Sequence, residues 1–348
     1  MKKFLKFLLY LILGAIIAFG LFLLYGTITD YQPPEEQTIY RSTHVKKLSD
    51  SAELSLLIWN IGYCGLSDDM DFFYDGGKQV RPPEKQVKEN CQNILGLLRE
   101  KEADIYLLQE VDRDAKRSYG INQYKKLKES FPNSFISFAK NYDVPFVPMP
   151  INNPMGRVEA GLVTVSGLQP QLSTRYSFPG NFSWPMKLFI LDRCFLVNRY
   201  PVEGNKELIV INTHNSAYDD GNLKLVQMQY LKDFLMEEYN RENYIIVGGD
   251  WNQLPYGFDP MFSTHMDSTS MPPVIPKNFL PNNWQWVYDK QVPTNRSLDT
   301  VYLENASKKR IIDFYLVSPN IRVNEIKGMD LQFKNADHQP VFARFQLN

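Results

Sequence analysis

The nine residues 244–252, YIIVGGDWN, carry the pattern that decides the fold of this chain. The apolar residues 244–247, rich in β-branched side chains, predict a buried strand. The two glycines that follow allow another backbone to approach closely, and Asp250 and Asn252 then share one face of an extended segment. A rigid strand that ends in polar side chains can hold a reactive site in a fixed geometry.

Five other apolar runs are bounded by polar side chains in the same way. They are LLIWN at 56–60, YLLQE at 106–110, VINTH at 210–214, RIID at 310–313 and DHQPV at 337–341. Each alone is a weak signal, because an Asp or Asn after a strand is commonly a turn residue. Asp313 is harder to dismiss, since a carboxylate inside an apolar run would be buried and would need a partner. Together the six runs predict one polar site.

Two of these strand ends offer oxygen ligands for a metal ion. Glu110 and Asn60 carry hard donors, which suit Mg²⁺ or Mn²⁺ rather than zinc. Such an ion neutralises charge on a phosphoryl group and stabilises the leaving oxygen. The pattern therefore favours chemistry on a phosphoester.

The remaining strand ends supply groups for proton transfer. Asp250 suits a base that orients or deprotonates water. His214 and His338 are candidate donors to phosphoryl oxygens. Asp337, next to His338 in the sequence, or the buried Asp313 could fix the tautomer of an imidazole.

The N-terminus predicts a membrane segment. Lys2, Lys3 and Lys6 precede an uncharged run over residues 7–25. At roughly 1.5 Å per residue this run spans a hydrocarbon core of about 30 Å. The lysines predict a cytoplasmic N-terminus and a single pass, with the rest of the chain on the extracytoplasmic side, periplasmic or extracellular.

A cleaved signal peptide is the competing interpretation of this run. Signal peptides have shorter apolar cores, of about 7–15 residues, and a small-x-small cleavage site, which the sequence lacks at the right place. We therefore expect an anchor over residues 1–26. A polar linker with two adjacent prolines follows over residues 27–51, and one folded domain over residues 52–348.

The rest of the chain alternates short strands with a few helices. Strands are expected at 54–59, 105–108, 188–197, 208–212, 244–247, 311–317 and 341–345. Helices are expected at 86–100 and at 222–239, the second capped by Asp219 or Asp220 and buried through Leu223, Val226, Tyr230 and Phe234. Residues 259–281 predict a long loop near the site. This order predicts two packed sheets with helices outside them.

The composition excludes some classes of protein. The net charge is −1, and the chain becomes slightly more acidic without its N-terminal lysines, so no global basic field attracts nucleic acid. The three cysteines show no CxxC pairing, which argues against a disulfide framework or a zinc site.

The motifs and their order resemble the endonuclease/exonuclease/phosphatase superfamily, in a membrane-anchored, bacterial-type form. The most specific motifs are LQEV at 108–111, GDWN at 249–252 and DHQPV at 337–341. The resemblance covers about residues 54–347. It implies a four-layer α/β/β/α sandwich of two mixed sheets with outer helices, and use of Mg²⁺ or Mn²⁺.

The resemblance also implies roles for the candidate residues. These are Glu110, Asn60 and Asp337 for the metal ion, Asp250 for the water, and Asn252, His214 and His338, the last held by Asp313, for the phosphate. Some branches carry another acid two residues after the first Asn, where this chain has Gly62. The number of metal ions at the site, one or two, therefore stays open.

Two basic residues near the predicted site are candidates for substrate binding. Arg81 follows an aromatic, glycine-bearing loop after the first strand, and Arg117 follows Glu110. Either could meet an anionic group. The alternative is an ordinary surface loop at each position.

The predicted function is hydrolysis of a phosphoester, a diester rather than a monoester. Lipid, soluble phosphodiester and nucleic acid are all possible substrates, and the anchor and acidic domain favour the first two. The alternatives are a nuclease that acts on DNA or RNA beyond the membrane, and an inactive sandwich that serves as a binding module. No protein partner is inferred, because fold alone does not specify function.

Overall fold

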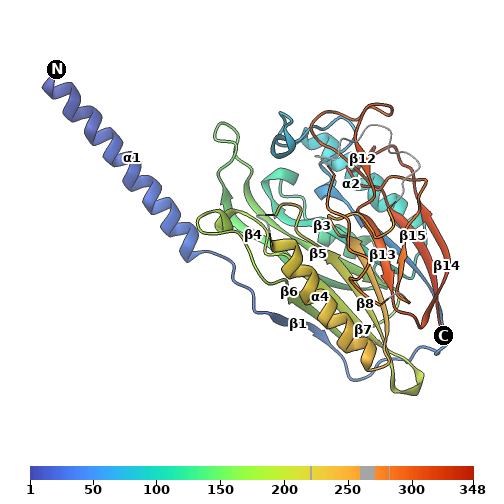
Figure 1. Ribbon diagram of the computed structural model, residues 1–348. Helices are drawn as coiled ribbons and strands as arrows, with labels where there is room; N and C mark the ends of the chain where they lie inside the picture. The colour runs from blue at the N-terminus through green and yellow to red at the C-terminus, as the bar shows by residue number, and fades with distance from the viewer. Residues whose placement is uncertain (220–221, 259–270, 282) are drawn as a thin grey trace.

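Two β-sheets pack face to face in the computed structural model, and helices cover their outer surfaces (Figure 1). The structure describes residues 1–219, 222–258, 271–281 and 283–348. β2 pairs in parallel with β3, and β8 with β9, while their other neighbours are antiparallel. Both sheets are therefore mixed.

The seven-stranded sheet has the order β1-β6-β7-β8-β9-β13-β10. Its strands are β1 (Glu36–Arg41), β6 (Leu172–Ser177), β7 (Cys194–Pro201), β8 (Glu207–His214), β9 (Tyr244–Asp250), β10 (Gln285–Val287) and β13 (Asp313–Val317). The six-stranded sheet has the order β14-β15-β2-β3-β5-β4. Its strands are β2 (Glu53–Asn60), β3 (Ile105–Ala115), β4 (Phe135–Val147), β5 (Gly156–Ser166), β14 (Ile321–Gly328) and β15 (Val341–Leu347).

The helices and short elements complete the fold. The helices are α1 (Lys2–Ile28), α2 (Glu84–Glu100), α3 (Gln123–Ser130) and α4 (Leu223–Asn240). A small ribbon joins β11 (Asn295–Arg296) and β12 (Lys309–Arg310). The 3₁₀ turns are η1 (Gly62–Cys64), η2 (Phe73–Asp75), η3 (Lys116–Ser118), η4 (Met186–Phe189) and η5 (Glu203–Asn205).

The alternation of side chains along β2 shows how the layers form. Leu56 and Ile58 point into the core between the sheets, whereas Leu57 and Trp59 pack against the buried face of α2. On the other sheet, apolar side chains of β8 and β9 alternate in the same way between the central core and α4. Strands covered on both faces give continuous apolar runs. The four-layer sandwich expected from the sequence is confirmed.

Several element boundaries differ from the expectation. The strand expected at 188–197 begins only at Cys194, because η4 occupies the start of that range. β3 continues past Leu108 through Glu110 to Ala115 with a bulge. The buried face of α4 differs from the expected one at Val226, which is 45% exposed. Leu223 is buried, and Tyr230 and Phe234 pack half-buried against the core, where Met228, Leu231 and Leu235 are also buried.

Two other expectations concern segments near the site. Asp219 does cap α4, because its carboxylate accepts hydrogen bonds from the backbone N–H groups of Leu223, at 2.8 Å, and Lys224, at 3.4 Å. Asp220 lies outside the described residues. So does most of the loop expected at 259–281, since its residues 259–270 are not described.

The N-terminal helix stands apart from the sandwich. Figure 1 shows α1 extending away from the body, and none of its apolar window is buried. By length and composition it could cross a membrane, a property that it shares with signal sequences. Its last turns touch the domain, where Phe22 stacks on Phe189 with ring centroids 5.6 Å apart.

The segment expected as a linker is partly folded. Within residues 27–51, β1 pairs antiparallel with β6 and adds an edge strand to the seven-stranded sheet. The backbone N–H groups of Ser42 and Ser177 continue this pairing at its two ends, donating to the carbonyls of Gln171 and Glu35 at 2.8 Å each. The sandwich therefore includes residues that precede the expected domain start at residue 52.

Candidate active site

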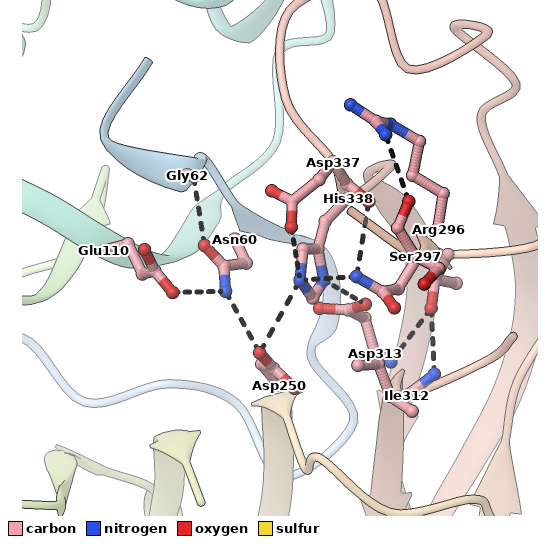
Figure 2. Close-up of polar contacts among 12 residues, drawn as sticks. Asn60, Gly62, Glu110, Asp250, Arg296, Ser297, Ile312, Asp313, Asp337 and His338 are labelled. Carbon is pink, nitrogen blue, oxygen red and sulfur yellow. Dashed lines mark hydrogen bonds and ion pairs between the residues drawn. The ribbon is translucent and has the colours of Figure 1, made fainter. Parts of the chain in front are cut away.

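The polar strand ends lie together at one edge of the two sheets (Figure 2). Asp250, the last residue of β9, is paired with His214, the last residue of the parallel strand β8. β13 runs antiparallel to β9, so its first residue, Asp313, pairs with Asp250. By the same logic His338, which precedes β15, lies near Asn60 at the end of the antiparallel strand β2. Strand direction alone thus brings distant segments of the sequence to one place.

The imidazole of His338 is buried and bonded on both nitrogens. Nδ1 lies 2.8 Å from Asp313 Oδ2, and Nε2 lies 3.0 Å from Asn295 Nδ2. Burial by itself would lower the pKa of His338, but the carboxylates of Asp313, Asp337 and Asp250 outweigh it and raise that pKa to about 10. In the imidazolium both ring nitrogens are donors, and Asn295 Nδ2 cannot accept a hydrogen bond. The amide of Asn295 must therefore be turned over in that state, so that its Oδ1 accepts from His338 Nε2. In that state His338 is a cationic donor at the site.

Asp250 lies at the centre of the group. Its Oδ2 accepts a hydrogen bond from Asn60 Nδ2 at 3.0 Å, and its Oδ1 accepts one from the backbone N–H of Asn252 at 2.9 Å. The Nε2 atoms of His214 and His338 lie 3.5 and 3.9 Å from Oδ2. Burial raises the pKa of Asp250 to about 6, although the charge of His338 opposes this shift. Above that pH the group is a carboxylate that can accept a proton.

His214 has a pKa that is shifted in the direction opposite to that of His338. Its side chain is buried, and burial together with the charge of Arg193 holds its pKa well below the usual value. Nε2 lies 4.0 Å from Glu110 Oε1, and Nδ1 has no hydrogen-bond partner among the described residues. The two histidines therefore differ in charge, because only His338 has a carboxylate within 3 Å of a ring nitrogen, that of Asp313.

Glu110 faces Asn60 because of a bulge in β3. The register of β3 and β5 shifts between Leu108 and Val111, and Glu110 adopts φ 55°. A non-glycine residue in this region is uncommon and usually held by its surroundings. The turn brings Glu110 Oε1 to 3.3 Å from Asn60 Nδ2.

Asp337 completes a set of oxygen donors that fits a divalent cation. Its carboxylate is buried, and Oδ1 has no hydrogen-bond partner among the described residues. Burial raises the pKa of Asp337 to about 7, and the charge of Glu110 adds to the shift. A buried carboxylate oxygen without a partner is costly, and a cation would satisfy it. The orphaned oxygen therefore supports a metal ion beside Glu110, Asn60 and Asp337.

Gly62 leaves room for this arrangement. It has φ 47°, and a Cβ atom there would lie 2.8 Å from Asp337 Oδ1. Its backbone N–H donates to Asn60 Oδ1 at 3.0 Å. A carboxylate side chain at this position would displace Asp337, so the second acid seen in some branches does not fit here.

Another group, on the other side of Asn60, has ligand atoms close enough together to hold a metal ion. One ligand atom each from Asp250, Asp313 and His338 lies within 4.8 Å of the others. However, Asp313 and His338 already bond to each other at 2.8 Å. The oxygen-only set around Glu110 suits a hard cation better.

Asn252 is fixed at the rim of the site. It adopts φ 51°, and its Nδ2 donates to the carbonyl of Asn215 at 2.9 Å. Its own carbonyl accepts from Lys224 Nζ at 3.3 Å. The side chain is thus held beside Asp250, although its amide N–H groups are partly engaged.

The two predicted basic residues lie in different surroundings. Arg117 is buried against Asp112, with Nη2 to Oδ1 at 2.9 Å, and Nη1 is 4.0 Å from Glu110 Oε2. Arg81 instead bonds to Asn153 Oδ1 at 2.6 Å. Arg117 therefore joins the metal side of the site through Glu110, while no contact connects Arg81 with the group around Asp250.

Sequence reasoning missed two supporting residues, Thr294 and Asn295. Thr294 Oγ1 accepts from the backbone N–H groups of Ile312 and Asp313, both at 3.0 Å, and fixes the start of β13. Asn295 bonds the ring of His338, as described above. These residues lie in a short polar run without periodicity, which is typical of a surface loop. The only local signal was the adjacent Pro293.

Comparisons with known proteins identify the family and the fold. The model of the Endonuclease/Exonuclease/phosphatase family matches residues 59–311. A solved endonuclease/exonuclease/phosphatase from Beutenbergia cavernae is 17% identical, with a TM-score of 0.57 over 85% of this chain and 72% of that one. One from Bacteroides vulgatus is 14% identical, with a TM-score of 0.54 over 85% and 100% of the two chains. ANGEL2, described as a 2',3'-cyclic phosphatase, is 16% identical, with a TM-score of 0.55 over 90% and 99%. No curated protein matches the chain. At these identities the likeness shows the fold.

Proposed function

The chain belongs to the endonuclease/exonuclease/phosphatase family, and from that premise we propose that it is a metal-dependent phosphoester hydrolase. The observation that carries the proposal is the surroundings of Asp250. This buried carboxylate lies within 4 Å of two histidines and accepts hydrogen bonds from Asn60 and Asn252. Such a group is placed to act on water beside a phosphate.

The proton roles follow from the charges of the side chains. Asp250, as a carboxylate, orients the water and accepts its proton. His338, held as a cation by Asp313, donates from Nε2 to a phosphoryl oxygen, which takes the place of Asn295 on that nitrogen. His214 is neutral and serves as a second donor from Nε2. Asn252 lies beside Asp250 and contacts the phosphate.

The metal ion is proposed as Mg²⁺ or Mn²⁺. Glu110, Asn60 and Asp337 would hold it, because each side chain carries an oxygen and Asp337 Oδ1 lacks a partner among the described residues. Asn60 Oδ1 accepts from the backbone N–H of Gly62 here, so Asn60 would bind the ion through the remaining lone pair of that oxygen or after its amide turns over. When bound, such an ion neutralises charge on the phosphoryl group and stabilises the leaving oxygen. We assign Arg117 a positioning role. Its charge is paired with Asp112, and its Nη1, 4.0 Å from Glu110 Oε2, orients the Glu110 carboxylate.

A phosphodiester is the preferred substrate type in this proposal. ANGEL2, which shares the fold, is described as a 2',3'-cyclic phosphatase, and a 2',3'-cyclic phosphate is a diester. The acidic balance of the chain disfavours a general nucleic-acid substrate. A lipid or soluble phosphodiester is therefore tested beside DNA.

The location proposed is the surface of a membrane. α1 would cross the bilayer, with the N-terminal lysines in the cytoplasm and the sandwich on the extracytoplasmic side. Contacts hold the end of α1 against the domain, including Trp184 Nε1, which donates to Thr27 Oγ1 at 3.2 Å. The site would then lie near the bilayer rather than free in solution.

The test is hydrolysis by the full chain in detergent micelles. The panel contains plasmid DNA, a phospholipid, an inositol phosphate and bis(p-nitrophenyl) phosphate, each with Mg²⁺, with Mn²⁺ and with chelator. We expect metal-dependent turnover. In Asp250→Asn and His338→Ala, kcat should fall by about 10²- to 10⁴-fold, the usual contribution of a positioned acid or base.

The matched control is Asp233→Asn, because Asp233 is exposed on α4 and lies about two and a half turns along the helix from Lys224, the helix residue that contacts Asn252. It should keep the wild-type rate. Full activity in Asp250→Asn would refute the assignment of the site. A folded, metal-loaded protein without turnover of the panel would favour the inactive binding module.

A further inference from the structure

Three cations at the active-site edge have no role in the proposed hydrolysis. Arg193 precedes β7, Lys224 lies in the first turn of α4, and Arg310 lies in β12. Among the described residues, Arg193 Nη1 and Arg310 Nε are buried without a hydrogen-bond partner, while the charge of Asp219 acts on Lys224. Arg117, by contrast, is closed off by Asp112 at 2.9 Å. Within the described part of the chain, the two arginines thus hold donors without an acceptor, and Lys224 adds a third positive charge.

The sheet register places Arg193 beside the catalytic row. Its neighbour Cys194 pairs with His214, and His214 pairs with Asp250. Burial is the largest cause of the lowered pKa of His214, and the positive charge of the nearby Arg193 guanidinium is the second largest. Arg193 Nη1 is buried and has no hydrogen-bond partner among the described residues. A buried donor of this kind is uncommon and points to a missing acceptor.

Arg310 approaches from the opposite side. It pairs with Asn295 in the β11–β12 ribbon, and Asn295 forms a bridge with His338. Its Nε is also buried without a partner in the described part of the chain. Asp75, Asp337 and Asp299 act on its charge, yet none lies within ion-pair distance.

Lys224 is close enough to both arginines for their charges to act on its ammonium group. Its Nζ contacts the carbonyl of Asn252 at 3.3 Å, next to Asp250. Burial lowers the pKa of Lys224, and the charges of Arg193 and Arg310 lower it further, although Asp219 and Asp250 oppose the shift. Three cations that repel one another in a partly buried site are costly, and a bound anion would relieve that cost.

We propose that Arg193, Lys224 and Arg310 bind a second anionic group of the substrate, so that the preferred substrate carries a further phosphate beside the scissile phosphoester. This inference rests on the proposed hydrolase function. A simple diester has one negative charge, which the metal ion and His338 already meet. The additional cations are matched only by a more highly charged substrate.

The first experiment measures anion binding without turnover. The full chain in detergent, with chelator present, is titrated calorimetrically with inorganic pyrophosphate and with inorganic phosphate. We expect pyrophosphate to bind at least about ten-fold more tightly, and Arg193→Gln and Lys224→Gln each to weaken it about ten-fold or more, as for lost charged hydrogen bonds. Arg193→Lys should retain part of the affinity, and Lys85→Gln, at an exposed position, should retain all of it.

The second experiment compares two substrates with the same scissile bond and leaving group. They are thymidine 5'-(p-nitrophenyl phosphate) with and without a 3'-phosphate. We expect the added phosphate to raise kcat/KM about ten-fold through KM, and the two Gln variants to lose that gain. Equal kcat/KM values for wild type, or a gain retained in both variants, would overturn the inference and leave the hydrolase intact. Pyrophosphate binding in chelator without turnover of any ester would instead refute the hydrolase and support the anion site.

Discussion

At the residue scale, the site depends on small groups that leave room for charged ones. Gly62 is the clearest case, because the space that its missing side chain leaves is next to the unpaired Oδ1 of Asp337. Glu110 and Asn252 also depend on local backbone geometry, since both adopt positive φ values that direct their side chains toward the site. Backbone strain of this kind persists where the surrounding structure holds it in place.

Gly62→Ala should weaken metal binding. The added Cβ would lie 2.8 Å from Asp337 Oδ1 and would push that carboxylate away from Glu110. We expect the Mg²⁺ concentration for half-maximal activity to rise about ten-fold, since a displaced ligand typically costs 10- to 100-fold in metal affinity. The measurement is activity against free Mg²⁺ concentration.

The control for this variant is Gly120→Ala. Gly120 also has a positive φ, of 69°, but nothing lies within 4 Å of a Cβ atom there. Both variants pay a similar backbone cost of about 1 kcal/mol. An equal Mg²⁺ requirement in the two variants would show that backbone strain, and not Asp337, explains the effect.

Single residues were predictable from sequence where a polar group ends an apolar run. Asp250 and Glu110 were found in this way, and the structure brings them to one edge of the sheets. Asn295 and Arg193 were missed, because each acts through pairing with a distant strand and no local pattern marks it. Arg81, a basic residue after an aromatic loop, bonds Asn153 in the structure, and its contact with a substrate stays a prediction.

At the element scale, the sandwich depends on how α4 is tied to its sheet. The guanidinium of Arg199, on β7, bonds the carboxylate of Glu238, on α4, at 2.6 and 3.0 Å. Glu207 and Asn243 also bond this pair. Glu238 is the more deeply buried of the two carboxylates on Arg199, so removing its charge leaves the guanidinium with only the more exposed Glu207 among these partners.

Glu238→Gln should destabilise the protein in a pH-dependent way. Burial by itself would raise the pKa of Glu238, but the bonds from Arg199 and Asn243 outweigh it and lower that pKa. The folded state then binds fewer protons than the unfolded state near pH 4, so this stabilisation is present above the unfolded pKa and is lost as pH falls through the folded pKa. We expect a loss of about 3 kcal/mol at pH 7. The difference from wild type should shrink below pH 4.

The measurement is thermal unfolding of the full chain between pH 3 and pH 8. Glu237→Gln is the control, because Glu237 is an exposed neighbour that pairs with Arg241 at the surface. It should change stability by less than about 0.5 kcal/mol at every pH. A Glu238→Gln effect that stayed constant with pH would show that lost packing and not lost charge is responsible.

Elements were predictable from sequence where their periodicity is strong and uninterrupted. β2, β9 and α2 appear close to the expected ranges. β4 was missed, because Pro145 and its alternating polar residues argue against a central strand. The structure places β4 at the edge of its sheet, where proline is tolerated. Residues 135–147 can form a strand because they lie at the edge of the sheet, a tertiary position that the local sequence does not reveal.

At the scale of the whole molecule, the chain before the expected domain start is part of the fold. β1 covers the edge of β6, and Leu48 forms a parallel bridge with Val202. Tyr230, on α4, donates to Glu35 at 3.2 Å, so the same segment also touches the outer helix. The composition of residues 27–51, with its prolines and polar residues, predicted a linker and no strand, because pairing with a distant strand leaves no local pattern.

Two truncations should therefore behave differently. A chain that starts at Asp30 lacks α1 but keeps β1, and we expect it to leave the membrane fraction and to remain monomeric. A chain that starts at Ala52 also lacks β1, so the edge of β6 is left open to pair with other molecules. We expect that chain to unfold at a lower temperature and to aggregate. Membrane fractionation, size-exclusion chromatography and thermal unfolding make the comparison. Full-length protein in the soluble fraction would contradict the anchor, while equal behaviour of the two truncations would show that β1 is dispensable.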